Sequence, residues 1–438
     1  MNRFPSPSCA PFAGKALLAA AVVCSLAATS FADVPATVGP VFVIALENHN
    51  WTQPASYTGT QAIKGNPNAP FINSLVTPGN PNAQYVSYAS NYLDAISLVT
   101  NADSHPSEPN YVWAEAGTDF GITNDNDPFG AGGTEQAAGT QHLTGLLQAS
   151  GQTWRSYQEG TQLYPTIGGG TVNNPSANAL TNVRAAPVDL TAPIKSFSGT
   201  STLYTNQYNG SHQYNYAGKH NPQIFFPDTS GGNDLTTANT ERTNYSAMEQ
   251  LSNDITAGTY AKYNWITPDQ YNDMHTALTG GFKYNGVALT GDSAQIAQGD
   301  NFLSIVVPMI EASDAFQNKN ATIIIWNDET EGDTKATNSQ FTSTEIVISK
   351  LAKGNAYTNT IQYDHSSDLK TMQEIYGVSA TTATGFLGGA ATATDLSDLF
   401  KAGTIPNAGA GAIPEPASLG LLALGALSML SRRSRRRA

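Results

Sequence analysis

The sequence contains little cysteine. Cys9 and Cys24 are the two cysteines among 438 residues, and both lie within residues 1–32. This segment has the pattern of a secretory signal, because Arg3 and Lys15 precede an apolar core that ends in small residues. A mature chain without this signal has no thiol. The absence excludes thiolate catalysis, metal ligation by cysteine and a disulfide, even in an oxidising compartment.

Positive charge is also scarce. The chain has 21 Lys and Arg against 34 Asp and Glu. Removing two basic residues with the signal and five with the C-terminal end leaves 14, so the mature body has a net charge near −20. Nucleic acid and anionic membrane surfaces are poor partners for such a body, whereas a divalent cation is a good one. We therefore expect no nucleic-acid partner.

The C-terminal end combines three features in a fixed order. Pro414-Glu415-Pro416 precedes an apolar run over residues 417–430, which is short for a membrane span, and five arginines follow over residues 432–437. This layout resembles the PEP-CTERM sorting signal of Gram-negative bacteria, and an ordinary tail anchor is the alternative. The resemblance implies that residues 412–438 are a sorting segment processed by an exosortase-type enzyme. It also implies export to the cell surface or beyond, with transient C-terminal anchoring in the membrane.

Between these ends, predicted strands alternate with predicted helices. The near-continuous apolar runs at 39–46 and 321–326 are typical of strands buried on both faces of a parallel sheet. Further strands are expected at 152–159, 263–267 and 344–349, and helices at 134–150, 241–255, 300–317 and 365–376. Residues 66–82 are expected to form a loop, and residues 160–218 have no clear pattern. The alternation predicts an α/β fold with a largely parallel central sheet and helices on both faces.

A loop followed by a helix is predicted over residues 104–117. Ser107 is a good N-cap residue, Pro109 suits the first turn and Gly117 suits the end. A hydroxyl at a helix N-terminus also lies where a phosphate binds well. Ser107 is therefore either a structural cap or a nucleophile.

Other polar clusters follow predicted strands or begin helices. Together they offer carboxylates, imidazoles and a hydroxyl, which is the ligand set of a divalent-metal hydrolase. A Ser-His-Asp acyl hydrolase is the competing arrangement, but no Gly-x-Ser-x-Gly elbow surrounds Ser107. The loop over residues 118–133 carries Asp119, Asp125 and Asp127, whose spacing matches no known calcium loop, so a solvated loop is expected.

Six short motifs occur in a characteristic order. They are Ile-Ala-Leu-Glu47-Asn48, His-Pro-Ser107-Glu-Pro-Asn110-Tyr111, Lys-His220-Asn-Pro, Pro-Asp-x-x-Asn-Asp273-Met-His275, Trp-Asn-Asp328-Glu329 and Asp-His365-Ser-Ser. This set resembles the bacterial phosphoesterase family of acid phosphatases and phospholipases C, within the alkaline phosphatase superfamily. The resemblance implies an alkaline-phosphatase-like fold for a phosphoesterase domain at residues 33–405.

The resemblance also implies roles for individual residues. Ser107 would form a phosphoenzyme, Asn110 would hold a phosphoryl oxygen and His220 would lie near the leaving group. One divalent metal ion would be bound by Glu47, Asp328 and Glu329 together with Ser107, with Asn48 as a neighbouring ligand or phosphate donor. Asp273, His275 and His365 would form a second metal cluster or hydrogen-bond the phosphate. The wider superfamily often has Asp-His at the positions of Asp328-Glu329, so metal identity and number stay open here.

We therefore expect an exported, metal-dependent hydrolase of phosphoric esters that prefers small phosphomonoesters. A phospholipase C or another phosphodiesterase is the first alternative, and a non-catalytic surface or biofilm-matrix protein is the second. The negative charge disfavours a phospholipid substrate, although Tyr204, Tyr208, Tyr214 and Tyr216 offer a lipid-accepting lip.

Overall fold

The computed structural model describes residues 36–94, 105–126, 128–130, 132–161, 195–202, 204–234, 238–332 and 340–408. The predicted signal and sorting segments, Asp127 and much of residues 160–218 lie outside these ranges. Within them, no helix is both long and apolar enough to cross a membrane.

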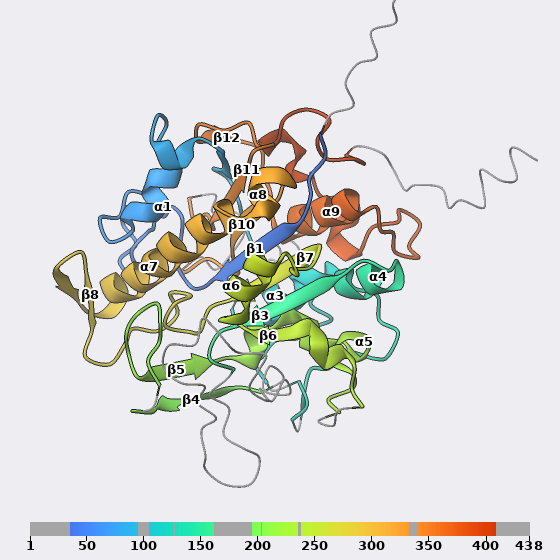
Figure 1. Cartoon of the computed structure of the whole chain (residues 1–438), viewed down its shortest axis with the longest axis horizontal. Coiled ribbons are helices and arrows are strands. Elements are labelled where there is room, and N and C mark those ends of the chain that lie inside the picture. The colour runs from blue at the N-terminus through green and yellow to red at the C-terminus, as the bar shows by residue number, and fades with distance from the viewer. Residues whose placement is uncertain are drawn as a thin grey trace, which may run out of the picture. The chain divides into compact units, whose positions relative to one another are not determined.

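One sheet of eight strands organises the chain (Figure 1). Its strands are β1 (Val41–Leu46), β2 (Val86–Ala89), β3 (Trp154–Gln158), β6 (Tyr245–Ala247), β7 (Tyr263–Thr267), β10 (Thr322–Asn327), β11 (Glu345–Ser349) and β12 (Tyr357–Asn359). Their order is β12-β2-β11-β10-β1-β7-β3-β6. The five strands from β10 to β6 run parallel, and β11 is antiparallel to both of its neighbours. The predicted largely parallel sheet is confirmed.

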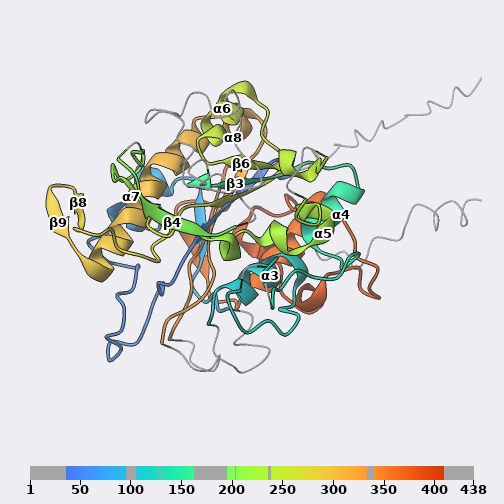
Figure 2. The same cartoon turned by 90° about the horizontal axis from the view of Figure 1, so that it is seen from below.

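Helices cover both faces of this sheet. They are α1 (Pro70–Leu75), α3 (Glu108–Ala116), α4 (Leu143–Ala149), α5 (Pro227–Ser230), α6 (Gln250–Ala257), α7 (Gly291–Glu311), α8 (Asp314–Asn318) and α9 (His365–Tyr376). Short 3₁₀ turns are η1 (Pro81–Ala83), η4 (Gly218–His220), η5 (Pro222–Phe225), η6 (Glu241–Asn244), η7 (Gly388–Ala391) and η8 (Leu396–Leu399). Figure 2 shows α3, α4 and α5 on one side of the sheet and α6, α7 and α8 on the other.

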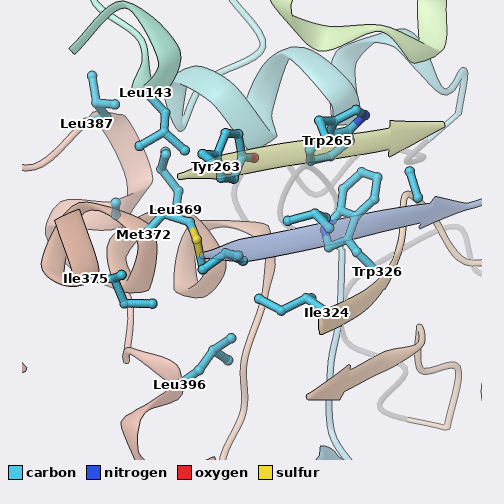
Figure 3. Packing of buried hydrophobic residues seen from close by; sticks show 14 of the residues in the cluster. Leu143, Tyr263, Trp265, Ile324, Trp326, Leu369, Met372, Ile375, Leu387 and Leu396 are labelled. Atoms are coloured by element: carbon cyan, nitrogen blue, oxygen red, sulfur yellow. The ribbon is translucent and has the colours of Figure 1, made fainter. Parts of the chain in front are cut away.

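The two faces of β1 belong to two separate hydrophobic clusters. Val41, Val43 and Ala45 face the cluster that α3 and α9 cover, whereas Phe42 and Ile44 face the cluster that α6 and α7 cover. In the first cluster, aromatic side chains of β7 and β10 meet aliphatic side chains of α9 (Figure 3). Burial on both sides explains why the strand is one unbroken apolar run.

Several predicted boundaries are wrong because contacts distant in the sequence decide them. The predicted loop at 66–82 contains α1 and η1. The Asp300 carboxylate of α7 accepts the N–H groups of Phe71 and Ile72, so α1 has a cap from another helix. The predicted helix at 241–255 is shorter, because Tyr245–Ala247 pairs with β3 instead. Two more predicted helices start elsewhere, α7 at Gly291 and α4 at Leu143.

Two hairpins lie outside the main sheet. They pair β4 (Phe197–Thr200) with β5 (Gln213–Tyr216), and β8 (Phe282–Tyr284) with β9 (Val287–Leu289). The first hairpin falls in the region without a clear sequence pattern. The alternative of a lipid-accepting lip is not supported, because its four tyrosines are each less than a tenth exposed: Tyr204, Tyr208, Tyr214 and Tyr216.

Candidate active site

The site lies where three parallel strands end. Glu47 follows β1 and Asp328 follows β10, and the last residues of these two strands lie opposite each other in the sheet. Asp273 lies on the loop after β7, and its backbone oxygen accepts a hydrogen bond from the Glu47 N–H at 2.8 Å. The carboxyl end of a parallel sheet therefore gathers acidic side chains that are far apart in the sequence.

Ser107 directly precedes α3, but its hydroxyl does not cap the helix. Its backbone is helical, with φ −63° and ψ −39°, whereas a capping serine normally has an extended backbone. The hydroxyl instead donates to Glu47 Oε2 at 3.1 Å and to Glu329 Oε1 at 3.3 Å. Pro109 in the first turn and Gly117 at the end are as predicted. The prediction of a capping side chain is wrong, and the hydroxyl belongs to the acidic cluster.

Four carboxyl groups are buried together here. Burial, with Glu329 close by, raises the pKa of Glu47 to about 8 despite the opposing charge of Lys219. Burial also raises the pKa of Glu329 to about 7, and it raises the pKa values of Asp273 and Asp328 well above their usual range. Buried like charges of this kind require protons or a cation.

Two groups of side chains within the acidic cluster have ligand atoms within 4.8 Å of one another, and a third such group, His105, Glu329 and Glu331, shares Glu329 with the cluster. Glu47, Asp328 and Glu329 form the first, and Glu47, His220 and Asp273 form the second. Both carboxylate oxygens of Asp328 are buried without a hydrogen-bond partner in the described part of the chain. Such orphaned acceptors fit a cation. The all-oxygen first group suits a hard divalent ion, and the second group adds one imidazole.

His220 is buried between two of these acids. Its Nε2 lies 3.4 Å from Glu47 Oε1 and its Nδ1 lies 3.5 Å from Asp273 Oδ2, but neither contact has hydrogen-bond geometry. The ring stacks on Tyr111, with 4.9 Å between centroids. Burial and the adjacent Lys219 lower the pKa of His220 well below its usual value. His220 is thus a neutral imidazole at the acidic cluster.

Asp273 and His275 are presented by a sharp turn around Met274. Met274 has a positive φ of 86°, which is strained for a residue with a side chain. Its side chain is fully buried against Gly299 of α7, where an added Cβ would lie 2.4 Å from Met274 Cγ. The missing side chain of Gly299 therefore leaves room for the residue that anchors this turn.

The two other predicted metal-ligand histidines lie outside both groups. The His275 ring centroid is 6.1 Å from that of His220, its Nδ1 bonds Thr276 Oγ1, and burial lowers its pKa to about 4. His365 begins α9, directly after the predicted cap Asp364. Its Nε2 lies 3.3 Å from the Asn327 carbonyl oxygen, and burial lowers its pKa to about 3. Their roles toward metal or phosphate remain predictions.

Two asparagines complete the predicted set. Asn110, on the first turns of α3, donates to Glu329 Oε2 at 3.2 Å. Asn48 follows Glu47 with a positive φ of 46°, which asparagine tolerates, and its Oδ1 is buried without a hydrogen-bond partner among the described residues. Asn110 therefore contacts a carboxylate of the acidic cluster, and Asn48 directly follows another in the sequence.

The site also contains residues to which the sequence analysis gave no role. His105 Nδ1 lies 2.8 Å from Glu329 Oε1, and the Tyr111 hydroxyl donates to Glu47 Oε1. Lys219 Nζ donates to Asp125 Oδ2 at 2.7 Å, so the loop expected to be only solvated reaches the site. The six motifs include three of these residues: His105, Tyr111 and Lys219. Membership of a motif was therefore the signal that could have identified them.

The chain is similar in sequence to several curated phosphatases. A phosphatidylinositol-3-phosphatase of Mycobacterium tuberculosis is 24% identical over 335 residues, which are 76% of this chain and 78% of that protein. A probable acid phosphatase of Kluyveromyces lactis and an acid phosphatase of Aspergillus fumigatus are each 27% identical, over 39% and 43% of this chain. The aligned parts span only 30% and 32% of these fungal proteins.

Similar solved structures include an alkaline phosphatase superfamily protein of Vibrio parahaemolyticus. It is 11% identical, with a TM-score of 0.40, over 84% of this chain and 73% of that one. The lipoteichoic acid synthase LtaP of Listeria monocytogenes is 8% identical, with a TM-score of 0.40, over 82% and 76%. Residues 412–437 match the PEP-CTERM protein-sorting motif, which indicates export and sorting to the envelope. Residues 47–379 match the Phosphoesterase family over most of the chain, and the chain belongs to that family.

Proposed function

We propose that this protein is an exported, metal-dependent phosphomonoesterase that works through a phosphorylated Ser107. One observation carries the proposal: the Ser107 hydroxyl donates to Glu47 and Glu329, at 3.1 and 3.3 Å, within a buried acidic cluster at the N-terminus of α3. A structural serine at this position would cap the helix, and this one does not. Membership of the Phosphoesterase family supports the same reaction class.

A divalent cation would be held by Glu47, Asp328 and Glu329, with Asn48 and Ser107 as neighbours. When bound, such an ion lowers the pKa of a neighbouring hydroxyl and stabilises negative charge on a phosphoryl oxygen. The unpartnered oxygens of Asp328 and the raised pKa values of the cluster support this assignment. We expect one cation in this group, while Asp273, His275 and His365 remain candidates for a second.

Residues of the chain carry out nucleophilic attack, phosphoryl binding and proton transfer. The Ser107 oxygen attacks phosphorus, and its proton leaves toward the Glu47 or Glu329 carboxylate to which it is already bonded. Asn110 holds a phosphoryl oxygen with its amide. His220, neutral and held by its stack on Tyr111, passes its N–H proton to the leaving oxygen and takes a replacement proton from the Asp273 carboxyl, which lies 3.5 Å away and whose pKa is raised by burial. Water then hydrolyses the phosphoserine and frees Ser107.

Metal removal and restoration test this function in the full chain. Chelation should abolish hydrolysis of a chromogenic aryl phosphate, and adding back Mg²⁺, Mn²⁺, Ca²⁺ or Zn²⁺ one at a time should show which ion restores it. Full activity in protein shown to be metal-free by elemental analysis would contradict the proposal. No turnover with any ion would favour the non-catalytic surface protein.

We place small phosphomonoesters before phospholipids as substrates. The four tyrosines of the expected lip are buried, and the net charge near −20 disfavours anionic lipid. The relatives from three organisms are all named as phosphatases, and one acts on a phosphoinositide. The kcat/KM for an aryl phosphate should exceed that for phosphatidylinositol 3-phosphate and for phosphatidylcholine. A clear preference for either lipid would reverse this choice.

Export would remove both ends of the chain. We expect exosortase-type processing after about Pro416, within the segment that matches the sorting motif. Intact-mass measurement of protein isolated from its native envelope tests the processing. A mass that retains the terminal arginines would contradict it.

A further inference from the structure

Lys219 is a cation at the edge of the acidic cluster. It belongs to η4, next to His220, and its side chain is only 16% exposed. Burial lowers its pKa, but the charges of Glu47 and Asp125 outweigh burial and raise the pKa above the usual value for lysine. The ammonium group is therefore charged at every physiological pH.

Asp125 joins this ammonium group to the helix that carries the nucleophile. One oxygen of Asp125 accepts Lys219 Nζ at 2.7 Å, and the other accepts the Glu108 N–H at 3.1 Å. Glu108 is the first residue of α3 and follows Ser107 directly. An ammonium group and the first N–H of the helix thus bind one anionic group beside Ser107. The ammonium group has three N–H donors, so two remain for the oxygens of a phosphoryl group after the bond to Asp125.

The net charge of the site indicates what the positive charge of Lys219 can contribute. Four buried carboxyl groups lie together at the site, and one divalent cation would neutralise only part of their charge. A phosphomonoester is a dianion near neutral pH, whereas a diester carries one negative charge. An additional fixed cation therefore favours the dianion more strongly than the diester.

We propose that Lys219 binds the phosphoryl group and makes the site selective for phosphomonoester dianions over phosphodiesters, with Asp125 holding the ammonium group beside Ser107. This inference rests on the proposed function and names its specificity residue. Lys219 supplies positive charge that a single divalent cation does not provide. Asp125 in turn has a positioning role in a loop that otherwise faces solvent.

The test compares Lys219→Met and Lys219→Arg in the full, metal-loaded chain. Lys353→Met is the matched control, because Lys353 forms a similar ion pair with Asp398, at 2.6 Å. Lys353 follows β11, which is antiparallel to β10, so it lies near the start of β10, whereas the site lies at the end of that strand. Two substrates are used, p-nitrophenyl phosphate and bis(p-nitrophenyl) phosphate. Calorimetry measures the binding of inorganic phosphate.

Lys219→Met should lower kcat/KM for the monoester about 100-fold and for the diester less than about 5-fold, since one charge-assisted contact is lost. Phosphate binding should weaken by a similar factor to monoester turnover. Lys219→Arg should keep most of the preference for the monoester, and the control should match the wild type.

Equal losses for both substrates would overturn the proposal, because they indicate a purely structural role. Unchanged phosphate affinity in Lys219→Met would overturn it as well. A wild type that hydrolyses neither ester would contradict the proposed function instead. Phosphate binding by wild type and variants would still decide the role of Lys219 in that case.

Discussion

Two buried histidines in this protein each lie between two carboxyl groups, yet their environments are opposite. His142 Nδ1 lies 3.0 Å from Glu115, and its Nε2 lies 2.8 Å from Asp228, both with hydrogen-bond geometry. His220 lies 3.4 and 3.5 Å from its two acids, without that geometry. The first ring joins α3, α4 and α5, whereas the second ring faces the acidic cluster at the end of the sheet.

Their pKa values shift in opposite directions for this reason. Burial alone would lower the pKa of His142, but the hydrogen bonds with Asp228 and Glu115 outweigh it and raise the value. Burial and the charge of Lys219 lower the pKa of His220. The ring of His142 thus bonds both of its neighbouring acids, whereas His220 bonds neither, and Asp273 Oδ2 has no hydrogen-bond partner among the described residues. The difference separates a region that stabilises the fold from the region that we propose binds a cation and a phosphoryl group.

Ser107→Ala should show the largest difference between its effect on turnover and its effect on stability. Turnover should fall at least about 1,000-fold, because the nucleophile is lost. The free energy of unfolding should fall by less than the ~1 kcal/mol of a helix cap, since the hydroxyl caps nothing. Steady-state kinetics and denaturant unfolding measure the two effects. Near-normal turnover would remove Ser107 from the mechanism.

His220→Gln tests the catalytic histidine. The kcat should fall about 100-fold, the usual contribution of a positioned proton donor, and a substrate with a good leaving group should lose less than one with a poor leaving group. Stability should change less than in the His142 variant described next. Equal losses for both leaving groups would show that His220 does not donate a proton to the leaving oxygen.

His142→Gln should show the reverse pattern. It removes one partner from a buried Glu115 and a half-exposed Asp228, so the free energy of unfolding should fall by about 2–3 kcal/mol. The kcat of the folded variant should remain within about twofold of the wild type at low temperature. His212→Gln is the control, because His212 bonds a backbone carbonyl and no carboxylate. A large loss of kcat without a loss of stability would place His142 in the catalytic machinery.

The smallest effect is the pH dependence that His142 gives to folding. Its pKa is raised in the folded state, so its stabilising contribution is complete below the unfolded value of about 6.5. The contribution is lost as the pH rises through the higher folded-state pKa. The difference in unfolding free energy between wild type and His142→Gln should therefore shrink over this range. A difference that is constant or grows with pH would contradict the assignment.

The difference between local patterns and contacts with distant residues explains which elements could be predicted from the sequence. Elements that local patterns determine were predicted correctly, such as β1, β7 and α9 with its cap Asp364. Elements that distant partners determine were not. The cap of α1 comes from Asp300, and the short strand β6 depends on pairing with β3.

The same difference between local patterns and distant contacts applies to the residues of the site. Strand ends and ordered motifs were enough to predict that Glu47, Ser107 and Glu329 belong together. The contacts of Lys219 with Asp125 and of His105 with Glu329 depend on loop conformations that a linear pattern does not encode. The hydroxyl of Ser107 turned to the acids because its backbone is helical, and composition gives no sign of this.

Trapping the phosphorylated enzyme tests the central claim most directly. The full chain is mixed with an aryl phosphate, quenched in acid during turnover, and mapped by peptide mass spectrometry. The account predicts phosphate on Ser107 in the metal-loaded wild type, and none on Ser107 after chelation or on residue 107 of Ser107→Ala. Continued turnover without any phosphate on Ser107, or undiminished turnover by the chelated protein, would contradict it.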